Sequence, residues 1–231
     1  MGYSIIIPIY KEEKNIAKMI RKVKYELNNK VKYELVFIDD DSADNSEKIF
    51  NKNKNKNTKL YIRKKKPRDL SKSVVFGFEK SKYHNLIVMD GDLQHNPRDI
   101  IKLIKKYEKS NCDIVIGSRE LKNAKDSNLN PIRFLFSKYL NQIFNFIFNR
   151  KILDPMSGFF ILKKRVYTNT KKDLVLLGYK ILIDILLSSN RKIIIKEVVI
   201  GFRVRDKGFS KMRLKILLQL ILLIILKYFK R

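Results

Sequence analysis

Short apolar runs alternate with amphipathic stretches from the start of the chain to about residue 119. Five runs have the length and composition of strands, at residues 3–7, 33–38, 59–62, 86–89 and 113–116. Between them, apolar residues recur at helical spacing, for example at Ile16, Met19, Ile20 and Val23. This alternation predicts an α/β fold with a mostly parallel sheet covered by helices on both faces, a Rossmann-like architecture suited to nucleotides.

The pattern changes after residue 120. Residues 132–148 predict a helix whose aromatic side chains are spread around much of its circumference, so that it is either buried on several sides or in contact with lipid. A turn is expected at residues 154–159, a further strand at residues 193–202, and a basic, glycine-containing loop at residues 205–211.

Residues 214–229 are apolar at nearly every position. Their uninterrupted apolar core, residues 220–226, is too short to cross about 30 Å of hydrocarbon. The stretch predicts a helix in the membrane interface, anchored by flanking lysines and arginines, with a core helix packed on the sheet as the alternative. We therefore expect one domain over residues 1–211, followed by a C-terminal helix over residues 212–231.

The apolar run at residues 86–89 ends abruptly in polar side chains. In extended backbone, residues two apart share a face, so Asp90, Asp92 and Gln94 are expected to converge, while Gly91 lets backbone or ligand come close. Two carboxylates and a carboxamide are hard oxygen ligands suited to Mg²⁺ or Mn²⁺ with positions left for phosphate oxygens. An acidic turn is the alternative, because Asp and Gly are common turn formers.

Composition adds a strong positive charge. The formal net charge is +28 at pH 7, which implies attraction to nucleic acid, anionic lipid or phosphorylated substrates. The single cysteine, Cys112, excludes an internal disulfide and fits a core position. No secretory signal pattern precedes the first predicted strand, so the active site is expected to face the cytoplasm.

Seven segments together resemble one family. In order, they are residues 7–12, 38–44, 68–73, 89–95, 117–119, 154–159 and 205–211. With them the sequence resembles the family 2 glycosyltransferases of the GT-A fold, and among these the polyprenyl-phosphate (dolichol-phosphate) mannosyltransferases. The resemblance implies a nucleotide-binding half over residues 1–119 and an acceptor-binding half over residues 120–211.

The resemblance also assigns roles to residues. It implies that Asp90, Asp92 and Gln94 hold the metal against the diphosphate of a sugar nucleotide. Nucleotide contacts are expected from Pro8, Tyr10, Glu12, Asp39, Asp40 and Asp90, and lipid-phosphate contacts from Arg119, Arg133, Ser137, Arg205 and Lys211. Catalysis is expected to depend on Asp92, Arg119, Arg205 and Lys211. Lys11, Asp41 and Gly91 depart from the residues usual in the family.

The implied reaction is an inverting, metal-dependent hexosyl transfer. The favoured donor is GDP-mannose, with a UDP-hexose as the other candidate, and the acceptor is a polyprenyl phosphate at the cytoplasmic membrane face. Because a phosphate acceptor is already ionised near neutral pH, it needs positioning by cations rather than a strong general base. The resemblance further implies peripheral membrane association, with a small membrane protein as a candidate partner.

Two alternatives stay open at this point. A related enzyme would act on a glycan hydroxyl and need a general base, for which Asp154 is the one placement considered. A basic nucleic-acid-binding protein is the non-enzymatic alternative. Against it, the aromatic residues lie in an apolar helix, whereas RNA readers place them among basic residues on an exposed sheet, so no nucleic acid partner is expected.

Overall fold

A computed structural model describes most of the chain. The described residues are 1–119, 142, 145–146, 151–178, 180–189, 193–201, 222–223 and 226–227. Within them the chain forms a sheet of seven strands in the order β3-β2-β1-β4-β6-β5-β7. The strands are β1 (Gly2–Ile9), β2 (Lys32–Asp39), β3 (Thr58–Ile62), β4 (Asn85–Val88), β5 (Ile114–Arg119), β6 (Phe160–Lys163) and β7 (Ile195–Ile200).

The sheet is parallel except at one strand. β6 is antiparallel to both of its neighbours, β4 and β5, whereas all other pairings are parallel. Every other strand therefore runs in the same direction, and the predicted mostly parallel sheet is confirmed. The carboxyl ends of those strands lie along one edge, where the segments that join them to the helices gather.

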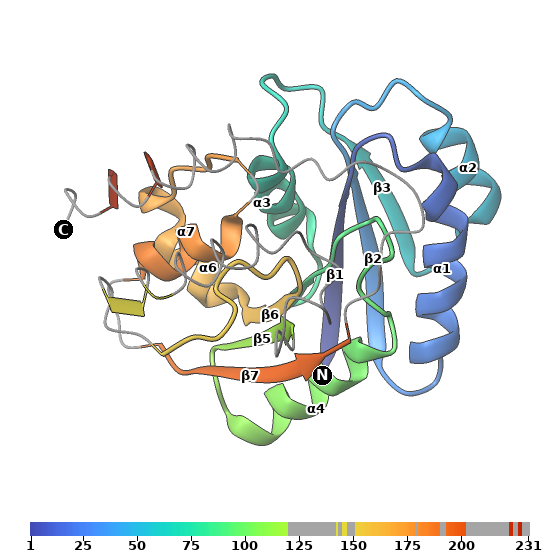
Figure 1. Ribbon diagram of the computed structural model, residues 1–231. Helices are drawn as coiled ribbons and strands as arrows, with labels where there is room; N and C mark the ends of the chain where they lie inside the picture. Colours follow the sequence, from blue (N-terminus) through green and yellow to red (C-terminus); the bar gives the residue numbers. More distant parts are fainter. Residues whose placement is uncertain are drawn as a thin grey trace, which may run out of the picture.

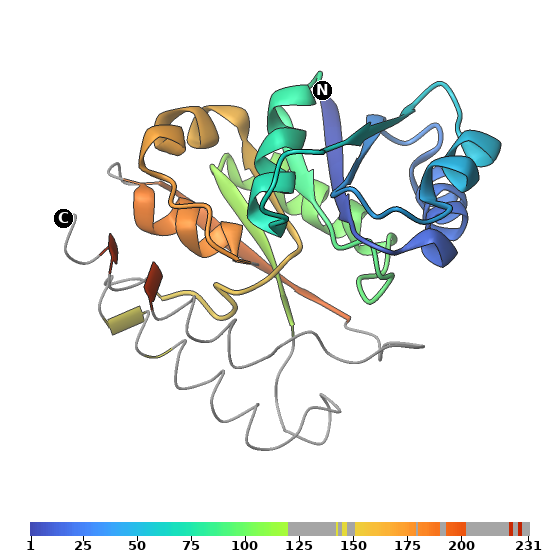
Figure 2. The same ribbon diagram turned by 90° about the horizontal axis from the view of Figure 1, so that it is seen from above.

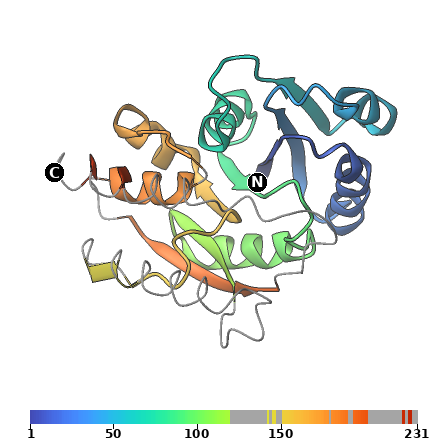
Figure 3. The ribbon, with the colours of Figure 1, turned by 45° about the horizontal axis from the view of Figure 1, so that its top comes forward.

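Helices cover both faces of the sheet, as Figures 1 and 3 show. The helices α1 (Glu13–Leu27) and α4 (Asp99–Ser110) lie on one face, with Phe50 of α2 (Ser46–Asn53) packed in the same cluster. On the other face lie α3 (Leu70–Lys80), α6 (Lys164–Thr170) and α7 (Ile181–Ser188). Figure 2 shows α3, α6 and α7 together on that side.

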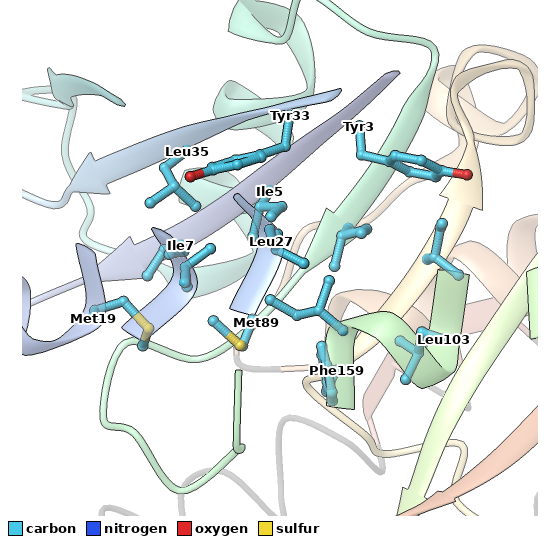
Figure 4. Packing of buried hydrophobic residues seen from close by; sticks show 14 of the residues in the cluster. Tyr3, Ile5, Ile7, Met19, Leu27, Tyr33, Leu35, Met89, Leu103 and Phe159 are labelled. Carbon is cyan, nitrogen blue, oxygen red and sulfur yellow. The ribbon is translucent and has the colours of Figure 1, made fainter. Parts of the chain in front are cut away.

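Each face of the sheet has its own apolar core, because side chains alternate along a strand. In β1, Ile5 and Ile7 enter the cluster under α1 and α4, whereas Ile6 enters the cluster under α3 and α7. Figure 4 shows the first cluster, where Met19 and Leu27 of α1 pack against the sheet. Burial on both faces explains why the central strands are continuous apolar runs rather than alternating ones.

Several local predictions differ from the structure. The low complexity of residues 51–57 predicts a surface turn, but helix α2 extends through Asn53 into this stretch. Asn96 and Pro97 are typical of an N-cap and a first helical residue, but helix α4 begins at Asp99, after a turn in which the Asn96 carbonyl accepts from the Asp99 amide. The strand expected at residues 193–202 is β7, over Ile195–Ile200. The helix predicted at residues 132–148 and the loop at 205–211 fall almost wholly outside the described residues.

The few described residues near the C-terminus contact the core on one side. Leu223 is buried in the cluster under α7, and Lys227, four residues on, is also buried. The Lys227 ammonium lies 3.0 Å from a carboxylate oxygen of Asp184 in α7, and the two side chains are only 4% and 2% exposed. Leu222 and Leu226, by contrast, are 47% and 41% exposed. Within the described part of the chain, no helix is long and apolar enough to cross a membrane.

The buried ion pair should make Lys227 costly to replace. In Lys227→Met the Asp184 carboxylate stays buried without its cation, so we expect the free energy of unfolding to fall by about 3–5 kcal/mol in urea titrations. Lys171→Met is the matched control, because Lys171 pairs with Glu79 on the surface, where the side chains are 55% and 43% exposed. That variant should lose less than about 1 kcal/mol. Equal losses in the two variants would contradict this account of the pair.

Candidate active site

The polar segments meet where the order of the strands reverses. From β1 the chain moves outward through β2 and β3, and then returns to place β4 on the other side of β1. Open α/β sheets bind ligands at the carboxyl ends of the strands that flank such a point. Tyr10 follows β1 here, and Asp90 follows β4. The turn at residues 154–159 leads into antiparallel β6 and lies at the same edge, because Phe160 pairs with Val88.

Asp90 is held in its ionised form at this edge. Its side chain is 36% exposed, and one carboxylate oxygen lies 3.5 Å from Nε2 of the buried His95. Burial disfavours the charged form, but the hydrogen bond from His95 and the positive charges of Lys180 and Arg119 keep the pKa of the Asp90 carboxyl below its usual range. Asp90 is therefore an anion near neutral pH, as a metal ligand must be.

Two glycines bring backbone close to this carboxylate and to the neighbouring strand. A Cβ added at Gly158 would lie 2.6 Å and 2.9 Å from the two carboxylate oxygens of Asp90. A Cβ at Gly91 would lie 2.7 Å from a methyl carbon of Ile9 in β1. Only glycine allows these approaches, so the turn at residues 154–159 and the end of β1 both pack directly against the Asp90 segment.

The backbone after Asp90 turns instead of continuing as a strand. β4 ends at Val88, residues 91–92 form a turn, and Leu93 has a φ of 62°. The Gln94 amide donates to a carboxylate oxygen of Asp92 at 3.1 Å. The extended geometry from which we expected Asp90, Asp92 and Gln94 to share a face is therefore wrong here, and their convergence on one ion stays a prediction. Among the described residues, no group of three or more His, Cys, Asp or Glu side chains is placed to hold a metal ion.

A buried ion pair joins the end of β5 to the turn before β6. Nε and Nη2 of Arg119 donate to the two carboxylate oxygens of Asp154 at 2.6 Å and 2.9 Å. Asp154 is almost fully buried, which would raise the pKa of its carboxyl, but the charge and hydrogen bonds of Arg119 outweigh burial and lower that pKa. Arg119, which we expected to bind lipid phosphate, thus also holds this turn in place.

On the nucleotide side, Arg68 links two of the expected contact residues, Tyr10 and Asp40, and also contacts Asp41. Its guanidinium lies 5.1 Å from the centre of the Tyr10 ring and donates to the backbone carbonyls of Asp40 and Asp41 at 3.1 Å and 2.9 Å. The amide of Lys11, which has a φ of 57°, donates to the Ser42 hydroxyl. The Lys11–Ser42 hydrogen bond therefore joins the loops after β1 and β2. Next to them, the exposed Arg68 guanidinium lies over the Tyr10 ring in a cation–π contact.

The two acids at the end of β2 have different surroundings. Asp39 is buried and accepts from the amide and hydroxyl of Ser42, and burial raises the pKa of its carboxyl. The Asp40 carboxylate lies 2.5 Å from the guanidinium of buried Arg63 and accepts from the Asp69 amide at 2.8 Å. Asp40 thus anchors the segment that leads into α3, and the nucleoside contacts expected of both acids stay predictions.

Several residues at this edge were not predicted. Lys180, just before α7, donates from its ammonium to the Met156 carbonyl at 2.9 Å. Burial and the charge of Arg119 lower the pKa of Lys180, against the opposing effects of Asp154 and Asp90. Arg63, His95 and Gly158 were also without assigned roles. His95 and Gly158 lie inside segments of family resemblance, whereas nothing in the local pattern around Lys180 or Arg63 indicates what they contact.

The structure brings some predicted residues together and leaves others outside. Asp90 and Arg119 lie near each other, as the electrostatic effect of Arg119 on Asp90 shows. Pro8 is part of β1 and Glu12 directly precedes α1, where it accepts from the side chain of Asn15 at 2.7 Å. The other acceptor-side predictions, Arg133, Ser137, Arg205 and Lys211, lie outside the described residues.

Comparison with known proteins identifies the family. Residues 4–170 match glycosyl transferase family 2, which covers more than half of the chain. The chain belongs to this family. Membership confirms the resemblance drawn from the seven segments and makes the chain a glycosyltransferase, so the non-enzymatic alternative is not supported.

Individual relatives of this glycosyltransferase have more specific names. A dolichol-phosphate mannosyltransferase of Pyrococcus furiosus is 35% identical over 215 residues, which are 92% of this chain and 60% of that protein. A dolichol-phosphate mannosyltransferase of Saccharomyces cerevisiae is 30% identical over 94% of this chain and 83% of its own length. The chain therefore spans only 60% of the length of its Pyrococcus relative.

Solved structures confirm the fold. Glucosyl-3-phosphoglycerate synthase from Mycobacterium tuberculosis, in complex with Mn²⁺, UDP-glucose and phosphoglyceric acid, has a TM-score of 0.75 over 98% of this chain and 79% of its own. The same protein with Mg²⁺ and UDP also gives a TM-score of 0.75. Their sequence identities to this chain are 15% and 16%, so they bear on the GT-A fold of this glycosyltransferase alone.

The Arg119–Asp154 pair should make stability depend on pH. Because the folded-state pKa of Asp154 is lowered, its contribution is present above the unfolded pKa of about 3.9 and is lost as pH falls through the lower folded value. We expect Asp154→Asn to be about 3 kcal/mol less stable than the wild type at pH 7. Urea titrations from pH 7 to pH 3 should show this difference shrinking only below about pH 4.

The exposed Glu79–Lys171 pair offers a control for this titration. Glu79→Gln should change stability at pH 7 by less than about 1 kcal/mol, because solvent screens a surface pair. A stability difference for Asp154→Asn that stays constant down to pH 3 would show that the ion pair is not its source.

Proposed function

We propose that this glycosyltransferase moves a hexose from a sugar nucleotide to a polyprenyl phosphate. The observation that carries the proposal is the charge arrangement at the carboxyl edge, where ionised Asp90 lies in the field of the cations Arg119 and Lys180. Such an edge offers an anion for a metal and cations for phosphate groups. The Pyrococcus and Saccharomyces relatives are named dolichol-phosphate mannosyltransferases, which supports a mannosyl group and a polyprenyl phosphate acceptor. GDP-mannose is proposed as the favoured donor, with a UDP-hexose as the other candidate.

On the donor side, the nucleotide would lie over the loops after β1 and β2. Pro8, Tyr10, Glu12 and Asp39 are proposed to contact the nucleoside. The Arg68 guanidinium on the Tyr10 ring adds a cation that a diphosphate would favour. Asp40 is proposed to act mainly through its contacts with Arg63 and the Asp69 amide, which position this loop.

The oxygen donors at residues 90–94 fit a hard divalent cation. Asp90 is ionised and partly exposed, and the Gly158 backbone packs close to its two carboxylate oxygens with no side chain between them. We propose that Asp90, Asp92 and Gln94 hold Mg²⁺ or Mn²⁺. The ion would supply Lewis-acid stabilisation of the charge on the departing nucleoside diphosphate.

On the acceptor side, cations would position a phosphate that is already ionised. Arg119 is proposed to serve here, with Arg133, Ser137, Arg205 and Lys211 as further contacts. Attack of the phosphate oxygen at the anomeric carbon in a single displacement breaks the bond to the nucleoside diphosphate and inverts the configuration. The Asp154 carboxylate, which transfer to a glycan hydroxyl would need as a base, is paired with Arg119 and has a lowered pKa. A phosphate acceptor is therefore favoured over a hydroxyl acceptor.

Membrane contact would bring the enzyme to its lipid acceptor. Leu222 and Leu226 expose apolar surface beside the buried Leu223 and Lys227, and the net charge of +28 favours an anionic leaflet. We propose peripheral association with the cytoplasmic face of the membrane, with a small membrane protein as a candidate partner.

A donor and acceptor screen tests the proposed reaction. Purified protein with Mn²⁺ or Mg²⁺ should form a lipid-linked hexose from GDP-mannose and polyprenyl phosphate, measured by organic extraction, and no product with soluble saccharides. Asp92→Ala should lower the rate at least about 100-fold, because metal assistance is worth several kcal/mol. Asp173→Ala, which removes an exposed acid remote from Asp90 in sequence, is the control and should keep the rate. Full activity of Asp92→Ala, or no product with any donor, would refute the proposal.

A second variant tests the close packing of Gly158 against Asp90. The added methyl group of Gly158→Ala must push the carboxylate aside, so we expect Mn²⁺ affinity to fall about tenfold and the transfer rate to fall with it. Gly201→Ala is the matched control, since a Cβ there meets nothing within 4 Å. Unchanged Mn²⁺ affinity in Gly158→Ala, measured by electron paramagnetic resonance of the ion, would exclude Asp90 as a ligand.

A further inference from the structure

Lys180 is a charged side chain at the active edge to which neither the family match nor the segments of resemblance assign a role. The family match ends at residue 170, and the segments of resemblance skip from residue 159 to residue 205. Its ammonium donates to the Met156 carbonyl at 2.9 Å, in the middle of the turn that packs on Asp90. Lys180 thus contacts the active edge from the segment that leads into α7.

Several contacts hold the turn at residues 154–158, among them one from the Asp154 amide to the Glu197 carboxylate of β7 at 3.3 Å. Asp154 is held by Arg119, and the Ser157 hydroxyl donates to the Gly117 carbonyl at 2.7 Å. Both of these contacts tie the turn to β5. Lys180 supplies a further contact, from the segment that leads into α7. The position of Gly158 against the Asp90 carboxylate therefore depends on β5 and on α7 together.

The backbone just before Lys180 is itself fixed to the nucleotide side. The Gly178 amide donates to a carboxylate oxygen of Asp69 at 2.7 Å, and the Gly178 carbonyl accepts from the Ser71 hydroxyl at 2.8 Å. The Asp69 amide donates in turn to the Asp40 carboxylate at 2.8 Å. A continuous set of hydrogen bonds thus leads from the loop after β2, through the start of α3, to the residue two before Lys180.

Contacts from α7 also hold the segment before Lys180, at residues 175–178. Asp184 in α7 accepts from the Val175 and Leu176 amides at 2.9 Å and 2.8 Å, and pairs with Lys227. The segment at residues 175–178 is therefore bonded on both sides. A lysine that leaves such a segment and ends on a backbone carbonyl has little freedom to move.

We propose that Lys180 is a positioning residue for hexosyl transfer, which holds the turn at residues 154–158 against Asp90 and fixes that turn relative to the nucleotide-side loops. The inference rests on the proposed function. The reacting groups of donor and acceptor would be bound on the two sides that Lys180 connects, and small misplacements of such groups cost large factors in rate.

The test compares two replacements of Lys180 with a matched lysine elsewhere. Lys180→Met keeps the apolar stem but removes the donor, whereas Lys180→Arg retains a cationic donor. Lys164→Met is the control, because the Lys164 ammonium also donates to a backbone carbonyl, that of Ser81, at 3.2 Å. That contact lies at the opposite edge of the sheet, beside the start of β4.

For a positioning residue we expect kcat of Lys180→Met to fall about 10- to 100-fold, with KM for the sugar nucleotide changed by less than about threefold. Lys180→Arg should recover most of the loss, and Lys164→Met should behave as the wild type. All proteins are to be compared at a temperature at which circular dichroism shows them folded. A kcat of Lys180→Met within twofold of the wild type would overturn the proposal. So would a rise in KM above about tenfold with kcat unchanged, which would make Lys180 a direct donor-binding residue.

A crystal structure of Lys180→Met separates this inference from the proposed function. If the wild type transfers no hexose with any donor, the proposed function fails, but the structure still shows whether the Met156 carbonyl and Gly158 have moved from their wild-type positions. An unchanged turn at residues 154–158 would refute the anchoring by Lys180 whatever the reaction is.

Discussion

The ion pair between Arg119 and Asp154 is the interaction on which the active edge depends. Arg119 ends β5, and Asp154 begins the turn into β6, the one strand of the described sheet that runs against the others. Either charge alone would be costly at its depth, so each fixes the position of the other. The reversed strand can then follow with Gly158 against Asp90. By fixing the turn before the reversed strand β6, the pair fixes the surroundings of the Asp90 carboxylate.

Charge balance follows from the same arrangement. Asp90, Asp92 and Asp154 bring negative charges to the edge, and Arg119 and Lys180 bring positive ones, so the described charges partly compensate one another before any ligand binds. A metal ion and a nucleoside diphosphate would add charges of opposite sign. The charges of the edge already have partners of opposite sign. The edge is therefore better suited to bind a metal cation together with a diphosphate anion than to bind either ion alone.

The fold was predictable because short local runs of residues indicate its strands and helices. Parts of the site were not predictable because they depend on contacts between residues far apart in the sequence. Runs such as residues 5–7 and 35–38 indicate strands buried on both faces without reference to any other residue. Strand β6 was missed, since three apolar residues and a lysine after a turn are ambiguous by themselves. Leu93 at positive φ contradicts the preference of its residue type, so the turn after Asp90 could not be expected. The role of Lys180 depends on a carbonyl 24 residues away.

The same distinction changes how the C-terminal residues should be interpreted. A lysine in an apolar stretch is ordinarily counted as a contact for lipid headgroups, and the flanking cations of residues 214–229 were interpreted in that way. The ammonium of Lys227 is instead bonded to Asp184 and Ser188, at 3.0 Å and 2.5 Å, and is not available to a headgroup while those contacts persist. Leu222 and Leu226 are exposed beside it. Membrane contact through these described positions would therefore be apolar rather than electrostatic, and Lys227 would contribute by fixing which side chains face outward.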